Sequence, residues 1–179
     1  MATYLLTWNP QKWTWEDLQD CIDETAKKGF IKFRWSCGNS KRIVKGDRVF
    51  LLRQGVEPRG IVASGWAASK SFEEIHWREE KALKERTTRY VKVRWEVLLN
   101  PENESIFPRE WLNVSPLSDV NWNTQISGIN IQCRQKAPVG TPLNFCKRRL
   151  AKLRKLSNAF DMARAVYKLV IAMIDSIAL

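Results

Sequence analysis

Hydrophobic and polar residues alternate in two stretches of the chain, one from Ile31 to Trp35 and one from Val91 to Val97. In both stretches the polar positions are Lys, Arg or Glu. A period of two residues is typical of a strand with one buried face and one solvated face. We therefore predict a half-buried β-strand at each stretch.

Three further stretches are apolar enough to be core strands. They run from Thr3 to Trp8, from Arg48 to Arg53 and from Gly60 to Ala67. Asn9-Pro10 predicts a turn that ends the first strand. The loop at 54–59 contains glycine and proline, so it predicts that the second and third strands pair as a hairpin.

The helical signals are fewer. Thr14 is a candidate N-cap for a helix that ends at Lys28-Gly29. A charged stretch from Phe72 to Arg86 predicts a second helix with a solvated face, and Ser157 or Asn158 can cap a third. A last short strand is expected between Ile126 and Ile131.

Many strands and few helices predict an α+β fold, built as a small, mostly antiparallel β-barrel with flanking helices. The composition changes near residue 144, because no tryptophan follows Trp122 and the segment becomes basic and then apolar. We expect one domain over residues 1–143. Residues 144–179 are expected to form a basic segment and an amphipathic C-terminal helix.

The net charge of the chain is +11, and most of it is local. Between Val120 and Phe160 there are eight Lys and Arg residues and no acidic residue. Such a segment favours a polyanionic partner or an anionic membrane surface. Charges interrupt the apolar run from Ala159 to Leu179, so it is not expected to span a membrane.

The residues that most enzymes need are scarce. His76 is the single histidine, and no phosphate-binding or dinucleotide-binding glycine motif occurs. The four cysteines are far apart in sequence and follow no secretory signal, which indicates free thiols in the cytoplasm. We expect no metal, no cofactor and no catalytic residue.

Nine tryptophans are the most distinctive feature of the composition. Trp13, Trp15 and Trp95 lie on apolar faces and are expected in the core. Trp8, Trp35 and Trp122 instead adjoin small or amide residues. An indole can stack on a base while a neighbouring amide or hydroxyl hydrogen-bonds to the base edge.

The order of several motifs resembles the EVE domain at the front of HNH-type, modification-dependent restriction endonucleases. The matching motifs, within residues 1–132, are Tyr4-Leu5-Leu6-Thr7-Trp8-Asn9-Pro10, Arg34-Trp35-Ser36-Cys37-Gly38, Gly46-Asp47-Arg48-Val49-Phe50-Leu51, Glu57-Pro58-Arg59-Gly60-Ile61 and Ser127-Gly128-Ile129. The resemblance implies a PUA-like barrel, related to the SRA and YTH folds, that flips a modified base into an aromatic pocket. The C-terminal third lacks the histidines of an HNH site, so the resemblance does not carry cleavage over.

Two sets of residues follow from this hypothesis. The base pocket is expected to contain Trp8, Asn9, Trp35, Ser36, Gly38, Trp122, Gln125 and Ser127. The phosphate contacts are expected from Arg42, Arg48, Arg53, Lys147, Arg148, Arg149 and Lys152.

The favoured function is therefore binding of modified DNA, with a modified cytosine as the expected base. Three alternatives stay open at this point: a reader of modified RNA, an enzyme that acts on the flipped base with Cys37 as nucleophile, and a structural subunit. For the last, residues 157–179 are expected to bind a protein partner or a second copy of the chain.

Overall fold

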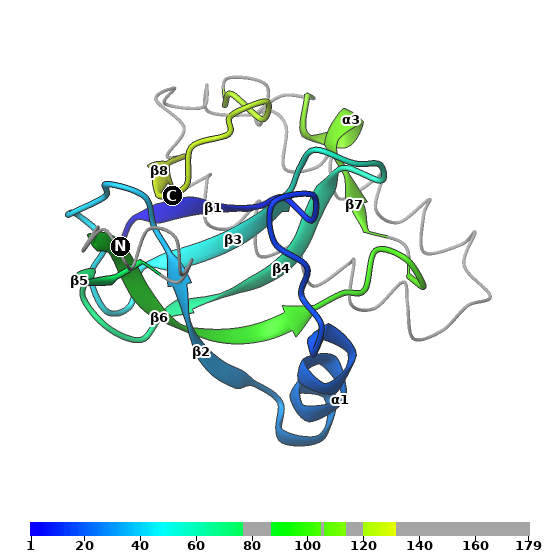
Figure 1. Ribbon diagram of the computed structural model, residues 1–179, viewed down its shortest axis with the longest axis horizontal. Helices are drawn as coiled ribbons and strands as arrows, with labels where there is room; N and C mark the ends of the chain where they lie inside the picture. Colours follow the sequence, from blue (N-terminus) through cyan, green and yellow to red (C-terminus); the bar gives the residue numbers. More distant parts are fainter. Residues whose placement is uncertain (77–86, 105, 114–119, 132–179) are drawn as a thin grey trace, which may run out of the picture.

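The computed structural model describes residues 1–76, 87–104, 106–113 and 120–131 of the 179-residue chain. The described part is one β-sheet with a helix packed at one end (Figure 1). The longer elements are β1 (Thr3–Trp8), α1 (Leu18–Lys28), β2 (Ile31–Ser36), β3 (Arg48–Arg53), β4 (Gly60–Ala67), β5 (Phe72–Ile75) and β6 (Thr87–Leu98). The short elements are β7 (Phe107–Pro108), α3 (Arg109–Leu112) and β8 (Ile129–Asn130).

The main path of the sheet follows the order β2-β6-β4-β3-β1-β8. Strands β1 and β3 are parallel, and every other pair is antiparallel. Strand β5 pairs with β6, and β7 pairs with β4. The β3–β4 hairpin lies in the middle of the sheet, and both of its strands are buried along most of their length.

The predicted closed barrel is corrected to an open sheet. Within the described residues, the path ends at β2 on one side and at β8 on the other, without a ladder that joins them. A single contact does link the two edges, because the Ser127 hydroxyl donates to the carbonyl oxygen of Ser36 at 2.6 Å. The α+β class agrees with the prediction, whereas full closure does not.

The strand predictions at Thr3–Trp8, Arg48–Arg53 and Gly60–Ala67 are confirmed, and so is the hairpin between the last two. The alternating stretch from Ile31 to Trp35 also forms a strand, β2, which ends one residue later at Ser36. The alternating stretch at 91–97 lies inside the longer β6. Near residue 129 the strand is shorter than predicted, because only Ile129 and Asn130 pair, with Leu5 and Tyr4 of β1.

Two helix predictions need correction. Residues 72–75 form the strand β5, because they pair in register with β6, and Glu73 and Glu74 bind Arg89 of β6 and Arg34 of β2. Residues 77–86 lie outside the described part. The first helix begins at Leu18, four residues after Thr14.

The later start of α1 has a physical reason. Trp13 and Trp15, which precede the helix, stack on each other with ring centroids 5.6 Å apart and pack against the sheet. Packing of these rings holds residues 13–15 in irregular backbone, and a turn at residues 16–17 leads into the helix. The helix then ends at Lys28, as predicted.

The division at residues 143 and 144, the C-terminal helix and the 157–179 interface all lie outside the described residues. Among the residues that are described, no helix is both long and apolar enough to cross a bilayer.

Candidate functional site

Two of the three tryptophans assigned to the pocket lie in the aromatic core. Trp35 has its ring centroid 5.0 Å from that of Trp15, 5.4 Å from Trp13 and 6.2 Å from Trp95. Trp8 meets Trp15 edge to face at 5.7 Å. These distances fall in the range of favourable aromatic packing.

The polar edges of both indoles are also occupied. The N–H of Trp8 donates to the carbonyl oxygen of Trp13 at 3.0 Å, and that of Trp35 donates to Thr7 at 3.2 Å. Only 6% of Trp8 and 7% of Trp35 is exposed. Neither ring presents an open face on which a base can stack.

Ser36, Gly38 and Ser127 form the contact between the two edges of the sheet. The Ser127 hydroxyl also accepts a hydrogen bond from the N–H of Thr7 at 3.3 Å. Gly38 has a φ of +58°, and a Cβ at this position would lie 2.7 Å from the carbonyl oxygen of Ser127. Glycine therefore allows the backbone after β2 to approach the segment before β8.

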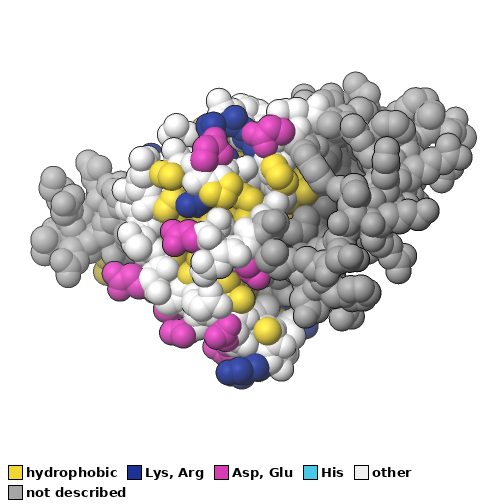
Figure 2. Space-filling model, turned by 90° about the vertical axis from the view of Figure 1, so that its right-hand side faces the viewer, with side chains coloured by type: hydrophobic (Ala, Val, Ile, Leu, Met, Phe, Trp, Pro, Cys, Tyr) yellow, Lys and Arg dark blue, Asp and Glu magenta, His cyan; other side chains and the backbone are white. Residues whose placement is uncertain are grey.

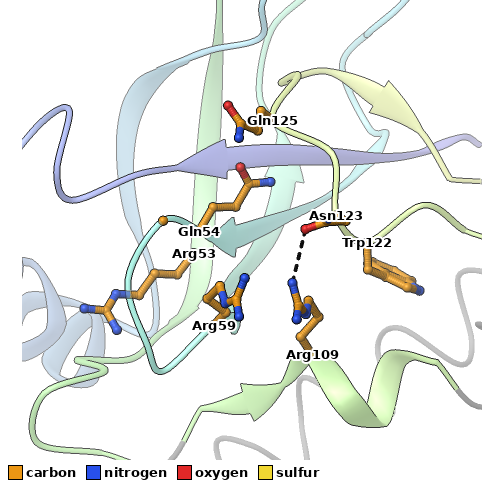
Figure 3. Close-up of a pocket in the computed structure, with 8 residues that line it drawn as sticks. Arg53, Gln54, Arg59, Arg109, Trp122, Asn123 and Gln125 are labelled. Carbon is orange, nitrogen blue, oxygen red and sulfur yellow. Dashed lines mark hydrogen bonds between the residues drawn. The ribbon is translucent and has the colours of Figure 1, made fainter.

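A polar pocket lies at the end of the β3–β4 hairpin (Figure 3). Its volume is about 200 Å³. Three arginines, three amide side chains, one glycine and one tryptophan line it: Arg53, Gln54, Gly55, Arg59, Arg109, Trp122, Asn123 and Gln125. We call it the arginine pocket. It contains three of the predicted site residues, namely Arg53, Trp122 and Gln125.

Backbone and side-chain contacts bring the walls of this pocket together. The pairing of β7 with β4 places Pro108 opposite Gly60, and the N–H of Arg109 donates to the carbonyl oxygen of Arg59 at 3.0 Å. The guanidinium of Arg109 donates to the Asn123 side-chain oxygen at 3.2 Å, as the dashed line in Figure 3 marks. Segments that are far apart in sequence thus meet at one site.

Two buried donor atoms in the pocket wall are unsatisfied. Within the part of the chain that the structure describes, neither Nε of Arg53 nor Nε2 of Gln54 has a hydrogen-bond partner. Arg53 instead donates from Nη1 to the carbonyl oxygen of Pro58 at 2.8 Å, and burial lowers the pKa of its guanidinium. A buried polar atom without a partner is costly. Both atoms are closed to solvent, so a ligand that brings acceptors reaches them only if the wall rearranges.

Trp8 and Asn9 contact the loop that lines the pocket without lining the pocket themselves. The N–H of Gln54 donates to the carbonyl oxygen of Trp8 at 2.8 Å, and the Arg53 guanidinium lies 5.8 Å from the centroid of the Trp8 ring. Gly55 has a φ of +84°, and a Cβ there would lie 2.4 Å from Oδ1 of Asn9. The turn after β1 thus fixes the loop that forms the pocket wall.

The electrostatic balance of the pocket is cationic. Against its three guanidinium groups stand two carboxylates: Glu57, which pairs with Arg59, and Glu102, whose charge acts on Arg53. The N–H and side chain of Arg59 both donate to Glu57 and, with the nearby charges of Arg59 and Arg109, hold the pKa of that carboxyl below its usual range. Glu57 is therefore ionised at neutral pH and compensates only part of the charge.

The predicted phosphate contacts lie in different settings. Arg42 is exposed in the loop between β2 and β3. Arg48 is buried, where it donates to the Ser64 hydroxyl at 3.0 Å and lies 4.5 Å from the centroid of Trp66. Burial lowers its pKa, and the charge of Glu96 opposes this effect. Lys147, Arg148, Arg149 and Lys152 lie outside the described residues.

Trp122 lines the arginine pocket, but only 3% of it is exposed. It therefore offers little open ring surface. Residues that the sequence did not single out for the site supply most of the polar lining: Gln54, Arg59, Arg109 and Asn123. The loop at 54–59 was recognisable as a turn, whereas the approach of Arg109 depends on the pairing of β7 with β4.

Cys37, the nucleophile of the enzyme hypothesis, is fully buried. Burial raises the pKa of its thiol to about 11, and the thiol contacts the carbonyl oxygen of Ser40 at 3.7 Å. The thiol is thus protonated at neutral pH, which is unfavourable for nucleophilic attack. The described residues contain no cluster of His, Cys, Asp or Glu arranged to hold a metal ion.

No protein-family model matches the chain, and no curated protein matches it significantly. Among solved structures, the chain is similar to a protein from Pseudomonas syringae, with 16% identity, a TM-score of 0.47, and coverage of 70% of this chain and 87% of that chain. A hypothetical protein from Leishmania major is 15% identical, with a TM-score of 0.43 and coverage of 87% of this chain and 97% of that chain.

Proposed function

We propose that the chain is a nucleic-acid-binding module that accommodates one unstacked, modified base in the arginine pocket. The observation that carries the proposal is the lining of this pocket, where guanidinium and amide donors surround a volume of about 200 Å³. The order of motifs that resembles the EVE domain supports the same function. The net charge of +11 favours a polyanionic ligand.

The size of the pocket favours a single-ring base. An engineered protein cavity of about 150 Å³ binds benzene, so about 200 Å³ accommodates a pyrimidine with its exocyclic groups. Drug-sized ligands occupy larger sites, of about 300 to 1,000 Å³. A modified cytosine, as the sequence led us to expect, is compatible with this volume.

The chemistry of the lining favours hydrogen bonding over stacking. Trp8 and Trp35 are committed to the core, and little of Trp122 is open. Unstacking a base costs a few kcal/mol, and hydrogen bonds from charged donors are worth about 1.5 to 3 kcal/mol each. Two such bonds, from Arg59 and Arg109, offset the cost of unstacking.

The donor-rich wall also favours a modification that carries oxygen. A buried methyl group adds only about 0.8 kcal/mol, or about fourfold in affinity. A hydroxyl, formyl or carboxyl oxygen can accept from the guanidinium groups of Arg59 and Arg109. The buried donors of Arg53 and Gln54 become available to such an oxygen if the pocket wall rearranges. We therefore propose an oxygen-bearing pyrimidine modification, in DNA in preference to RNA.

The test is a binding screen of the full chain against otherwise identical duplexes with cytosine, methylcytosine, hydroxymethylcytosine or carboxylcytosine at one position, and against the matched RNAs. We expect the oxygen-bearing DNA duplexes to bind at least fivefold more tightly than the unmodified duplex. Equal affinity for all DNA duplexes contradicts the proposal, and a consistent preference for modified RNA transfers it to the RNA alternative.

A further inference from the structure

A second cationic surface lies on the sheet at the edge formed by β2 and β6. Its members are Lys32 and Arg34 of β2 and Lys92 and Arg94 of β6, and we call it the basic face. In the antiparallel register, Lys32 is directly opposite Arg94 and Arg34 is directly opposite Lys92. Directly opposed side chains lie on the same face of a sheet, about 4.5 to 5.5 Å apart at Cβ.

Like charges in directly opposed positions destabilise a sheet. The chain places two such pairs next to each other, two positions apart along each strand. That separation corresponds to about 6.6 Å. Four cations on so small an area repel one another unless anions lie beside them.

The carboxylates nearby compensate only part of this charge. Glu74 pairs with Arg34, and Glu96 pairs with Arg94 at 3.0 Å. Glu96 also lies 3.6 Å from the buried Arg48. Across the described ranges, neither Lys32 nor Lys92 has an ion-pair partner, and both side chains are exposed.

Aromatic rings lie among these cations. The charged groups of Lys32 and Arg94 lie 5.3 Å and 4.4 Å from the centroid of the Phe30 ring, and that of Arg34 lies 4.8 Å from the Tyr90 ring. These cation–π contacts hold the charged groups close to the sheet while leaving much of Arg34 and Arg94 exposed. Figure 2 shows one face of the molecule, on which acidic side chains and a few basic ones lie around hydrophobic side chains.

We propose that the basic face binds the sugar–phosphate backbone of the nucleic acid whose base enters the arginine pocket, several nucleotides away from that base. Arg94 is opposite Trp66 near the end of β4, whereas the pocket lies at Gly60, where β4 begins. This inference rests on the proposed function. Phosphate oxygens can pair with Lys32 and Lys92 without requiring a particular sequence, because contacts to the backbone position a nucleic acid and contacts to a base specify it. The basic face supplies affinity, and the pocket supplies selectivity.

The experiment compares the wild-type chain with Lys32→Gln/Lys92→Gln, over a series of salt concentrations, on a modified and an unmodified duplex. The matched control is Lys27→Gln/Lys28→Gln, which removes the same number of positive charges at another place, the last turn of α1. We expect the slope of log affinity against log salt to become shallower by about 1.8, from about 0.9 for each lost phosphate contact. The ratio of affinities for modified and unmodified duplex stays unchanged.

If the Lys32→Gln/Lys92→Gln variant has the same salt slope as the wild type and the control, the inference about the basic face is overturned. The proposed function is not, because the wild type still binds nucleic acid. Absence of any nucleic-acid binding by the wild type overturns the proposed function and this inference together. Vesicles that contain phosphatidylserine test a membrane as the alternative partner. If the wild type binds these vesicles and the double variant does not, while the salt slope for nucleic acid is the same in both, the basic face binds a membrane surface instead. A melting temperature of the double variant at or above that of the wild type shows that weaker binding does not come from unfolding.

Discussion

The backbone N–H of Gln54 donates to the carbonyl oxygen of Trp8 across 2.8 Å, so the end of β1 holds the first residue after β3. This bond continues the parallel pairing of the two strands beyond its last register pair, Trp8 with Arg53. It places the side chain of Gln54 in the wall of the arginine pocket. The geometry of the pocket therefore depends on residues that do not line it.

Gln54→Met is expected to separate binding from stability. In the free protein Nε2 of Gln54 is buried without a partner in the described part of the chain, so an apolar side chain of similar shape is neutral or stabilising. Urea unfolding should give an unchanged or higher free energy of unfolding. Affinity for the oxygen-bearing duplex should fall by about fivefold or more, for the loss of about 1 kcal/mol or more. Lower stability with unchanged affinity would show that this amide serves the fold alone.

Gly55→Ala is expected to disturb the pocket through Asn9. Alanine at a positive φ costs about 1 to 2 kcal/mol, and a Cβ at Gly55 also meets the Asn9 amide at 2.4 Å. Gly46→Ala is the matched control, because φ is +93° there and no atom lies within 4 Å of a Cβ. We expect the Gly55 variant to lose more stability than the control in urea unfolding. Combining it with Asn9→Ala should recover the difference, and additive losses would argue against the contact.

Ser127→Ala tests the contact that joins the two edges of the sheet. The substitution removes the bond to Ser36 and leaves the N–H of Thr7 without its partner. The expected loss is about 1 to 3 kcal/mol of unfolding free energy. Asn39→Ala, at an exposed position in the loop after β2, serves as the control and should change little. Equal effects of the two variants would mean that the edges are held by other contacts.

Trp8→Ala is expected to destabilise the protein by about 3 to 5 kcal/mol, as for other large aromatic side chains removed from a core. Trp8 packs on Trp15 and bonds to Trp13. Circular dichroism during thermal unfolding checks this, and a variant with wild-type stability contradicts the core placement. A lower affinity of this variant indicates a role in binding only if the variant is still folded at the temperature of the binding measurement.

The buried thiol of Cys37 predicts a loss of stability at alkaline pH. Burial raises its pKa from 9.0 to about 11 in the folded state. The folded state thus binds the proton more tightly, so this contribution to stability is complete below pH 9 and is lost as the pH rises to about 11. The change is on the order of 3 kcal/mol. Unfolding of Cys37→Ala between about pH 8 and 11 should show a shallower decline than the wild type, and an identical decline would contradict the assignment.

Much of the strand content could be predicted because local pattern and tertiary setting agree. The alternation at Ile31–Ser36 and the apolar run at Arg48–Arg53 both place their apolar side chains in the sheet. Residues 72–75 were misassigned because their charges favour a solvated helix, whereas their pairing with β6 decides the structure. Closure of the barrel was also not determined by periodicity, since it depends on whether the two edge strands pair.

The site was harder to predict than the fold. Sequence neighbours suggested that Trp8 and Trp35 line a pocket, but the packing of Trp13, Trp15 and Phe33 encloses both rings. Arg53 and Gln125 do line the pocket. Arg59 and Arg109 come together only through the pairing of β4 with β7, a non-local contact without a sequence signal in a two-residue strand.

The most direct test of the account is the ratio of the dissociation constants for an unmodified duplex and an oxygen-modified duplex, measured for the wild type, Arg109→Met and Arg42→Met. Arg109 lines the arginine pocket, whereas Arg42 is exposed elsewhere on the surface. We predict that Arg109→Met brings the ratio close to one, and that Arg42→Met weakens binding to both duplexes equally and leaves the ratio unchanged. An unchanged ratio in Arg109→Met would contradict recognition of the base by this pocket.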